Sequence, residues 1–153
     1  MNNHFNRGIT LIETLLIISI IGILAAIVLP GFARIKKVQI LKSTTEEIVS
    51  VLEKARSQTL ASLNSSSYGV HFETNKVIIF TGTSFVSDDV NNQIINIMLP
   101  ATISNINLNN ASTFLYFNRL SGIPSTSGNI TVSVPDIPSK VINISATGSA
   151  SIN

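Results

Sequence analysis

Residues 9–29 read ITLIETLLIISIIGILAAIVL, and this stretch decides how the chain is organised. It carries a single charged side chain, Glu13, close to its start. A helix rises about 1.5 Å per residue, so this run would be about 30 Å long, the thickness of the hydrocarbon core of a bilayer. The sequence therefore predicts a membrane-spanning helix at the N-terminus.

A cleaved secretory signal peptide is the alternative interpretation of the same stretch. Only eight residues precede it, and they carry Arg7 and the titratable His4. Three features count against this alternative. The apolar run is longer than the usual hydrophobic region of a signal peptide, no A-x-A-like site follows it, and Glu13 interrupts it. We therefore expect the span to be retained.

Glu13 is the unusual residue of the span, because a carboxylate in hydrocarbon costs several kcal/mol unless a partner neutralises it. It is either a functional residue or a side chain that reaches the interface from the helix end. The apolar run contains no Lys, Arg or His. A compensating cation would have to come from a chain terminus or from another subunit.

The composition excludes several classes of protein. The chain has 153 residues, about one domain, of which 44% are hydrophobic and 12% charged, too apolar for a disordered chain. It has no cysteine and two histidines, so disulfides, thiolate sites and a His-rich metal or catalytic site are not expected. Residues 1–57 hold seven basic and four acidic residues, whereas residues 58–153 hold three and four. The larger part therefore offers no basic face for nucleic acid.

The N-terminus resembles a known family of signals. Arg7-Gly8, then Ile9-Thr10-Leu11-Ile12-Glu13, then an apolar run to Pro30, resembles the class III signal sequence of type IV prepilins and type II secretion pseudopilins. The resemblance implies that a prepilin peptidase cuts between Gly8 and Ile9 and that Ile9 becomes N-methylated. It also implies that Glu13 assists assembly by meeting the N-terminal amine of a neighbouring subunit, which would supply the missing cation.

The charges around the span conflict with this resemblance over orientation. Arg34, Lys36 and Lys37 follow the span while Arg7 precedes it, and the positive-inside rule alone would leave the C-terminus in the cytoplasm. The resemblance implies the reverse: a single-pass protein of the bacterial inner membrane, with a cytoplasmic leader and a periplasmic or extracytoplasmic head, that later enters a fibre. We adopt this second orientation.

Beyond the span, Pro30 predicts a kink or a local melt of the helix. A helical pattern then resumes with one mostly apolar stripe. The stripe consists of Ile35, Val38, Leu41, Thr45, Ile48, Leu52, Ala55 and Thr59. We interpret it as the face that packs on the rest of the chain, with a filament contact as the alternative for its upper part, from Ile35 to Leu41. The serine-rich segment Asn64–Ser67 should end this helix.

Short strands follow, separated by turn signals such as Thr81-Gly82 and Pro135 to Pro138. The expected strands are 68–73, 76–81, 93–100, 101–108, 112–117, 129–134 and 140–146. The predicted fold class is α+β: a long N-terminal helix, membrane-spanning in its first half and amphipathic in its second, packed on a small antiparallel two-sheet β head. The predicted parts are a leader (1–8), a transmembrane helix segment (9–30), an amphipathic helix (31–63) and the head (64–153).

The head resembles the GspH/FimT minor pseudopilins. The resemblance rests on Tyr68-Gly69-Val70-His71-Phe72 after the helix, on Phe117 followed by Gly122 and Gly128, and on a last strand pair about Thr147-Gly148. We interpret the strand aromatics as core residues, not as a ligand platform. They are Phe72, Phe80, Phe114 and Phe117.

The chain offers little for catalysis. His71 has no second histidine near it along its strand, which favours a surface or half-buried structural residue over a ligand. Asp88-Asp89 is interpreted as a polar turn, with a calcium loop as the alternative. No nucleotide loop or nucleophile motif occurs. We expect no enzyme activity, no metal and no cofactor, and a membrane-anchored hydrolase is set aside.

The leading hypothesis is therefore structural: a minor pseudopilin or minor pilin of a type II secretion pseudopilus or type IV pilus. Its expected partners are other pilin or pseudopilin subunits, prepilin peptidase, the inner-membrane assembly platform and the membrane. The alternative is a competence minor pilin that binds DNA with its head. Nucleic acid binding is not expected, because the residues after Gly148 are uncharged and phosphate contacts need cations.

Overall fold

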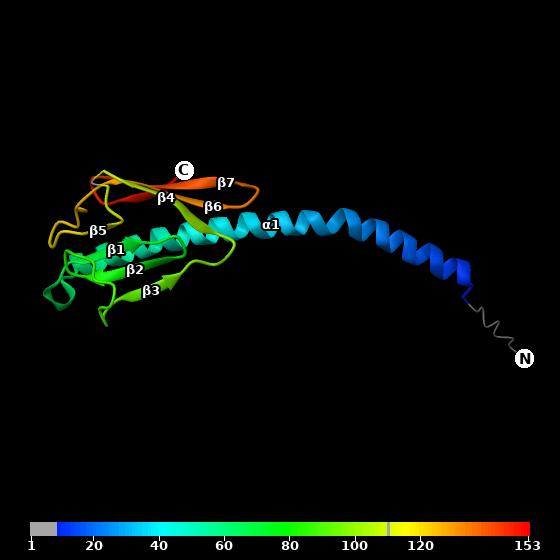
Figure 1. Cartoon of the computed structure of the whole chain (residues 1–153), viewed down its shortest axis with the longest axis horizontal. Helices are drawn as coiled ribbons and strands as arrows, with labels where there is room; N and C mark the ends of the chain where they lie inside the picture. Colours follow the sequence, from blue (N-terminus) through cyan, green and yellow to red (C-terminus); the bar gives the residue numbers. More distant parts are fainter. Residues whose placement is uncertain (1–8, 110) are drawn as a thin grey trace, which may run out of the picture. The chain divides into compact units, whose positions relative to one another are not determined.

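A computed structural model of the chain describes residues 9–109 and 111–153 (Figure 1). The predicted leader, residues 1–8, lies outside the described residues. The chain divides into two units, one that ends at Lys36 and one that comprises Lys37–Asn153. Helix α1 (Leu11–Leu60) belongs to both units, and it is 50 residues long.

In the first unit α1 carries the apolar run of the sequence. The helix continues without a break through position 30, so the local melt is not seen, while the kink at Pro30 stays a prediction. Every leucine, isoleucine and valine from Leu11 to Leu29 is between 47% and 82% exposed. The first half of the predicted helix is thus a helix whose apolar side chains are uncovered on all sides.

In the second unit the predicted stripe is buried. Leu41, Ile48 and Leu52 are each 2% exposed. The two threonines of the stripe are also buried. Their hydroxyl groups tolerate burial because they donate to helix carbonyls one turn earlier, as Thr59 does to Ala55 over 2.9 Å. The Thr59 oxygen also accepts the backbone N–H of Tyr68 at 2.9 Å. The interpretation of the stripe as the packing face is confirmed from Leu41 onward.

A short 3₁₀ turn and eight strands follow α1 within the described residues. They are η1 (Leu63–Ser65), β1 (Tyr68–Phe72), β2 (Lys76–Thr81), β3 (Gln93–Asn96), β4 (Thr102–Leu108), β5 (Phe114–Tyr116), β6 (Gly128–Val134), β7 (Ile137–Ile144) and β8 (Ala150–Ile152). The strands form two antiparallel sheets of four, in the orders β3-β2-β1-β5 and β4-β6-β7-β8.

Both sheets and the second half of α1 share one core. Leu52 from the helix, Val70 and Ile79 from the first sheet, and Ile130 and Ile142 from the second all belong to the same buried cluster. Each fully buried aliphatic side chain contributes about 1.5–3 kcal/mol relative to its exposed state. The α+β class, with two antiparallel sheets against the amphipathic half of a long helix, is confirmed.

Several element ends differ from the predicted ones for local reasons. The helix ends at Leu60, and Ser62 and Asn64 after it adopt positive φ. Strand β3 stops at Asn96, four residues early, because the chain turns at Met98 to Ala101 before Pro100 could pair. The predicted strand at 112–117 shortens to Phe114–Tyr116, where it pairs with β1.

The turn predicted from Pro135 to Pro138 is shorter than expected. Val134 pairs with Ile137, so the turn has two residues, with Asp136 at φ 64°, and β7 already contains Pro138. A proline is tolerated there because β8 pairs only with residues 142–144 of β7, which leaves the first half of β7 at a sheet edge.

Candidate functional site

The start of α1 is organised by a contact between two residues that lie three positions apart in the sequence. The hydroxyl oxygen of Thr10 accepts the backbone N–H of Glu13 at 3.3 Å, and the Thr10 carbonyl accepts the N–H of Thr14 at 3.2 Å. Thr10 is therefore the N-cap, and Glu13 occupies the third helical position. A carboxylate in the first turn is stabilised by the unsatisfied N–H groups and the dipole of the helix.

The predicted cleavage position lies directly before this cap. Ile9 and Thr10 precede the helix, and the Ile9 side chain is 76% exposed. Gly8 lies outside the described residues. The described side of the junction is thus non-helical and accessible, the state in which a backbone can enter a peptidase.

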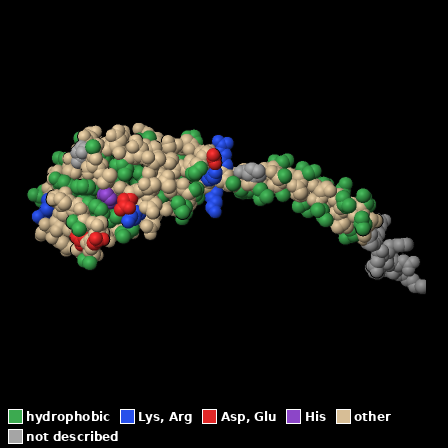
Figure 2. Space-filling view, viewed as in Figure 1, with side chains coloured by type: hydrophobic (Ala, Val, Ile, Leu, Met, Phe, Trp, Pro, Cys, Tyr) green, Lys and Arg blue, Asp and Glu red, His purple; other side chains and the backbone are tan. Residues whose placement is uncertain are grey.

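Beyond the cap, exposed apolar side chains dominate the surface of the first half of the helix (Figure 2). Soluble monomers rarely expose contiguous apolar patches of more than a few hundred Å². Among the described helices, α1 is long and apolar enough to cross a membrane. Hydrocarbon or the apolar helices of other subunits are the surroundings that this surface suits.

Residues 3–29 match the prokaryotic N-terminal methylation motif. The match includes the Gly8–Ile9 junction and Glu13, the residues on which the resemblance to prepilins rests. No curated protein and no solved structure matches the chain. The methylation motif supports a type IV pilin-like precursor that prepilin peptidase processes, and it points to a structural subunit.

The fold agrees with the methylation motif. One long N-terminal apolar helix followed by two antiparallel four-stranded sheets is an α+β fold like that of type IV pilins. The motif implies interaction with prepilin peptidase and with pilin subunits, and together with the apolar helix it fits a single-pass inner-membrane protein. The roles of Gly8, Ile9, Glu13 and Pro30 stay predictions.

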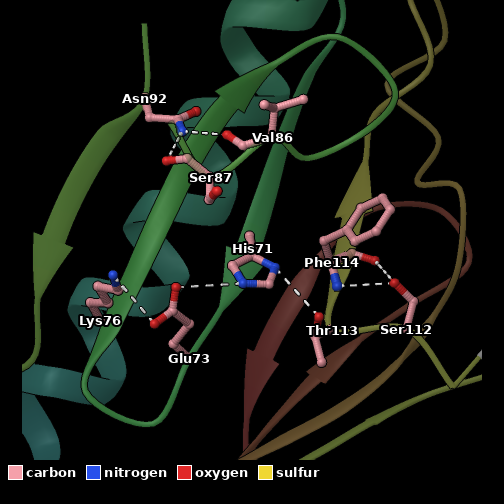
Figure 3. A network of polar contacts seen from close by, with 9 residues as sticks. All are labelled: His71, Glu73, Lys76, Val86, Ser87, Asn92, Ser112, Thr113 and Phe114. Carbon is pink, nitrogen blue, oxygen red and sulfur yellow. Dashed lines mark hydrogen bonds and ion pairs between the residues drawn. The ribbon is translucent and has the colours of Figure 1, made fainter. Parts of the chain in front are cut away.

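His71, the other candidate that the sequence singled out, lies on β1 in a small polar network (Figure 3). Its Nε2 is 3.6 Å from Oε1 of Glu73, and the other carboxylate oxygen of Glu73, Oε2, is 3.3 Å from the Lys76 ammonium group. Its Nδ1 is 3.4 Å from the Thr113 hydroxyl group. The ring stacks on Phe85, with centroids 3.9 Å apart and planes 7° apart. His71 is thus half-buried, in agreement with the surface or half-buried position predicted for it, while its structural role stays a prediction.

The environment of His71 disfavours its charged form. Burial lowers the pKa of His71, the Glu73 carboxylate opposes this, and the Lys76 ammonium group adds to the lowering. No group of three or more His, Cys, Asp or Glu residues among the described residues is placed to hold a metal ion. The network therefore fastens β1, β2 and the segment before β5 to the loop that contains Phe85.

The aromatic predictions hold with one refinement. Phe72 and Phe117 belong to the main core. Phe80 is 1% exposed but lies outside that cluster, and it contacts Phe85 and the half-buried Phe114 edge-on, at 5.6 and 5.7 Å between ring centroids. The first sheet therefore buries aromatic side chains on both faces.

Gly69 explains how the second aromatic cluster packs. A Cβ atom at Gly69 would lie 2.3 Å from the Phe80 ring and 2.6 Å from the carbonyl oxygen of Leu115. Only glycine allows the ring to lie across β1 at this distance.

Asp88 and Asp89 lie in the loop between β2 and β3. The Asp89 carboxylate accepts the backbone N–H of Asn91 at 2.8 Å and its side-chain amide at 2.9 Å. This is an Asx turn, so the interpretation as a polar turn is confirmed.

Sequence reasoning missed four contacts that hold the second unit together. Lys37 pairs with Asp136 at 2.8 Å, Arg56 donates to the carbonyl oxygens of Gly122 and Thr147, and Phe85 stacks on His71. No local signal identifies such partners. The Thr10 cap was also missed, although the spacing Thr-x-x-Glu before an apolar run is a readable signal.

Proposed function

We propose that the chain is a minor pilin or minor pseudopilin, a structural subunit of a type IV pilus or a type II secretion pseudopilus. The observation that carries the proposal is the methylation motif over residues 3–29, on a helix whose apolar side chains are exposed from Leu11 to Leu29. A helix of this kind is stable only in a bilayer or among similar helices, which are the two environments of such a subunit.

Maturation is the first step of the proposed function. Prepilin peptidase cuts between Gly8 and Ile9, and the new amine of Ile9 is methylated. The proposal is supported by the exposure of Ile9 and by its place outside the helix, because a peptide bond inside a capped helix would have to unwind first.

The proposed topology assigns a role to each part of the sequence. Residues 1–8 are the cytoplasmic leader, residues 9–30 span the inner membrane, and residues 31–63 continue as the amphipathic helix. Residues 64–153 are the head on the extracytoplasmic side. The contrast between the exposed apolar run and the buried stripe that begins at Leu41 supports this division.

Assembly is the second step, and Glu13 is its proposed residue. Its backbone N–H bonds to the Thr10 hydroxyl group, which fixes the backbone of residue 13 one turn after Ile9, while the Glu13 side chain is exposed and can reach another chain. The methylated amine of a neighbouring subunit would neutralise it in an apolar environment, where an unpaired charge is costly.

The GspH/FimT-like head is the finer part of the proposal. The residues that carry the resemblance occupy structural key points: Tyr68–Phe72 forms β1, between two neighbours of its sheet, and the turns at Gly122 and Gly148 approach each other. The DNA-binding alternative gains no support, since β8 is uncharged and Lys76 is paired with Glu73. We therefore do not propose it.

Co-expression with a prepilin peptidase tests the proposed function. The intact mass should fall by the mass of residues 1–8 and rise by that of one methyl group on Ile9. Gly8→Val should block the cut and leave membrane insertion unchanged, because the bilayer recognises the apolar run and the peptidase recognises the junction. A mature chain that begins near Ala26 would instead identify an ordinary signal peptide and overturn the proposal.

A further inference from the structure

Two basic side chains, Arg34 and Lys36, follow the proposed span on α1, and their position is suited to binding an anionic ligand. We propose that Arg34 and Lys36 bind the anionic headgroups of membrane phospholipids on the side from which the head emerges. This inference rests on the proposed function in one respect, the placement of residues 9–30 in the bilayer.

The spacing along the helix brings both side chains to the headgroup layer. With the hydrocarbon core ending near Leu29, Arg34 lies about 8 Å and Lys36 about 10 Å further along the helix axis. The headgroup regions add about 10–15 Å to the hydrocarbon thickness over the two leaflets, and long basic side chains reach back toward the bilayer from just outside it. A phosphate group is therefore within reach of either cation.

Their charges are uncompensated in the described part of the chain. The next cation, Lys37, pairs with Asp136 at 2.8 Å, and Lys42 lies 3.9 Å from Glu46. Arg34 and Lys36 are exposed and form no ion pair with any described residue. Figure 2 shows Lys and Arg side chains gathered along α1 beyond the apolar run. Two free cations within one turn of the helix favour an anionic surface.

The neighbouring apolar side chains favour lipid over a soluble anion. Phe32 and Ile35 alternate with the two cations along the chain and are 65% and 63% exposed. Aromatic and aliphatic side chains next to basic ones are typical of helix segments that lie at the headgroup boundary. The same pattern offers no advantage for free phosphate in water.

The proposed contact also explains why cations follow the span although the head is translocated. Each Lys or Arg near an anionic surface strengthens the association by about fivefold. Two of them hold the segment from Phe32 to Lys36, here called the neck, at the bilayer. The association is weak enough for release when the subunit is drawn into a fibre.

Lipid selectivity around the neck tests the proposal. The chain has no cysteine, so Ala33→Cys places a single fluorophore beside the two cations. The full chain is reconstituted in two preparations of phosphatidylcholine vesicles. One contains a small fraction of spin-labelled phosphatidylglycerol, and the other contains the same fraction of spin-labelled phosphatidylcholine. Both labelled lipids carry the nitroxide near the top of the acyl chain. The ratio of the two quenching efficiencies reports how strongly the anionic lipid is enriched.

We expect a ratio clearly above one for the wild-type neck, falling by up to about fivefold in Arg34→Gln or Lys36→Gln. The double variant should give a ratio near one, while Lys42→Gln, which removes a partnered cation, should keep the wild-type ratio. High salt should lower the wild-type ratio, because exposed charges are screened.

Two results would overturn the inference: a wild-type ratio near one, or a double variant that keeps the wild-type ratio. If the ratio is near one and the double variant loses crosslinks to sister subunits, the cations serve a protein contact instead. The same vesicles are treated with prepilin peptidase. A chain that is cut at Gly8 but shows no lipid selectivity contradicts this inference alone, whereas an uncut chain contradicts the proposed function.

Discussion

Arg56 and Gly122 are joined by a hydrogen bond of 3.0 Å from the Nε of the guanidinium group to the glycine carbonyl oxygen. The same side chain donates through Nη2 to the carbonyl oxygen of Thr147, also at 3.0 Å. Gly148 follows at φ +85°, and a Cβ atom there would lie 2.6 Å from the Gly122 oxygen. One helix side chain thus fixes two turns that only glycine allows to approach so closely.

The second unit is expected to fold without the membrane span. Its core, from Ile40 of α1 to Ile144 of β7, lies entirely within Lys37–Asn153. A fragment of residues 34–153 should therefore give mixed helix and sheet by circular dichroism and one cooperative transition in urea. Helix without a cooperative sheet signal would show that the amphipathic helix is a stalk and not part of a domain.

Arg56→Met in this fragment should lower the free energy of unfolding by roughly 1–3 kcal/mol, because two carbonyl groups lose a charged donor. Urea unfolding measures the difference. Lys42→Met is the matched control: it removes an exposed helix cation whose pair with Glu46 is worth about 0.5 kcal/mol or less. Equal effects of the two substitutions would mean that Arg56 does not hold the turns.

The stability of the fragment should depend on pH through His71. Its pKa in the folded state lies below the ordinary value of 6.5, first because of burial, so the unfolded chain binds the proton more readily. Above pH 6.5 both states are neutral and the effect vanishes. As the pH falls below 6.5, the unfolded state gains protons first and the folded state loses stability until its own pKa is passed.

His71→Gln is the variant that separates this effect from other titrations. The variant should lose the part of the pH dependence that appears just below pH 6.5, as measured by urea midpoints. His71 is the only histidine of the fragment, so an NMR titration of its ring follows it directly. A ring pKa at or above 6.5 would contradict the prediction. The pKa of Asp136 is lowered by its hydrogen bond to Lys37. The loss of folding stability caused by protonation of Asp136 therefore appears only in more acidic solution, below about pH 4.

Glu13→Gln should leave membrane insertion unchanged or improve it, because it removes a charge from hydrocarbon. The Thr10 cap uses the backbone of residue 13 and survives the substitution. Incorporation with sister subunits should fall, since the amine of the neighbour loses its partner. Crosslinking or pull-down of the full chain measures this. If the variant assembles as well as wild type, Glu13 makes no contact between subunits, and a tip position or a side chain that reaches the interface becomes the better account.

Much of this architecture is local enough to be read from the sequence. The three- and four-residue spacing from Leu41 to Thr59 identified a face that is indeed buried, and the alternation in Tyr68–Phe72 identified β1. The periodicity could not show where burial begins. Ile35 and Val38 continue the stripe, yet they are 63% and 49% exposed. The periodicity of a helix identifies which face is apolar, whereas how far along the helix that face is buried depends on the length of the element that packs on it.

The contacts missed by sequence reasoning are those set by topology. His71 was expected to lie at the surface or to be half-buried, but its stacking partner Phe85 lies in a loop without a regular period. The Pro135–Pro138 segment looked like one long turn, because the sequence does not reveal that Pro138 falls on an unpaired edge. Such features depend on which strands become neighbours.

The bond between Lys37 and Asp136 closes a loop of 99 residues, and Arg56 reaches across 66 and 91 residues. Helices form locally within about a microsecond, whereas pairings this distant are slow to find. In the proposed topology the head crosses the membrane with its N-terminal side first, so Lys37 and Arg56 are exported long before their partners at Asp136 and Thr147. If that topology is correct, these contacts close only after almost the whole head has been exported, and assembly with other subunits then has to wait for export to finish.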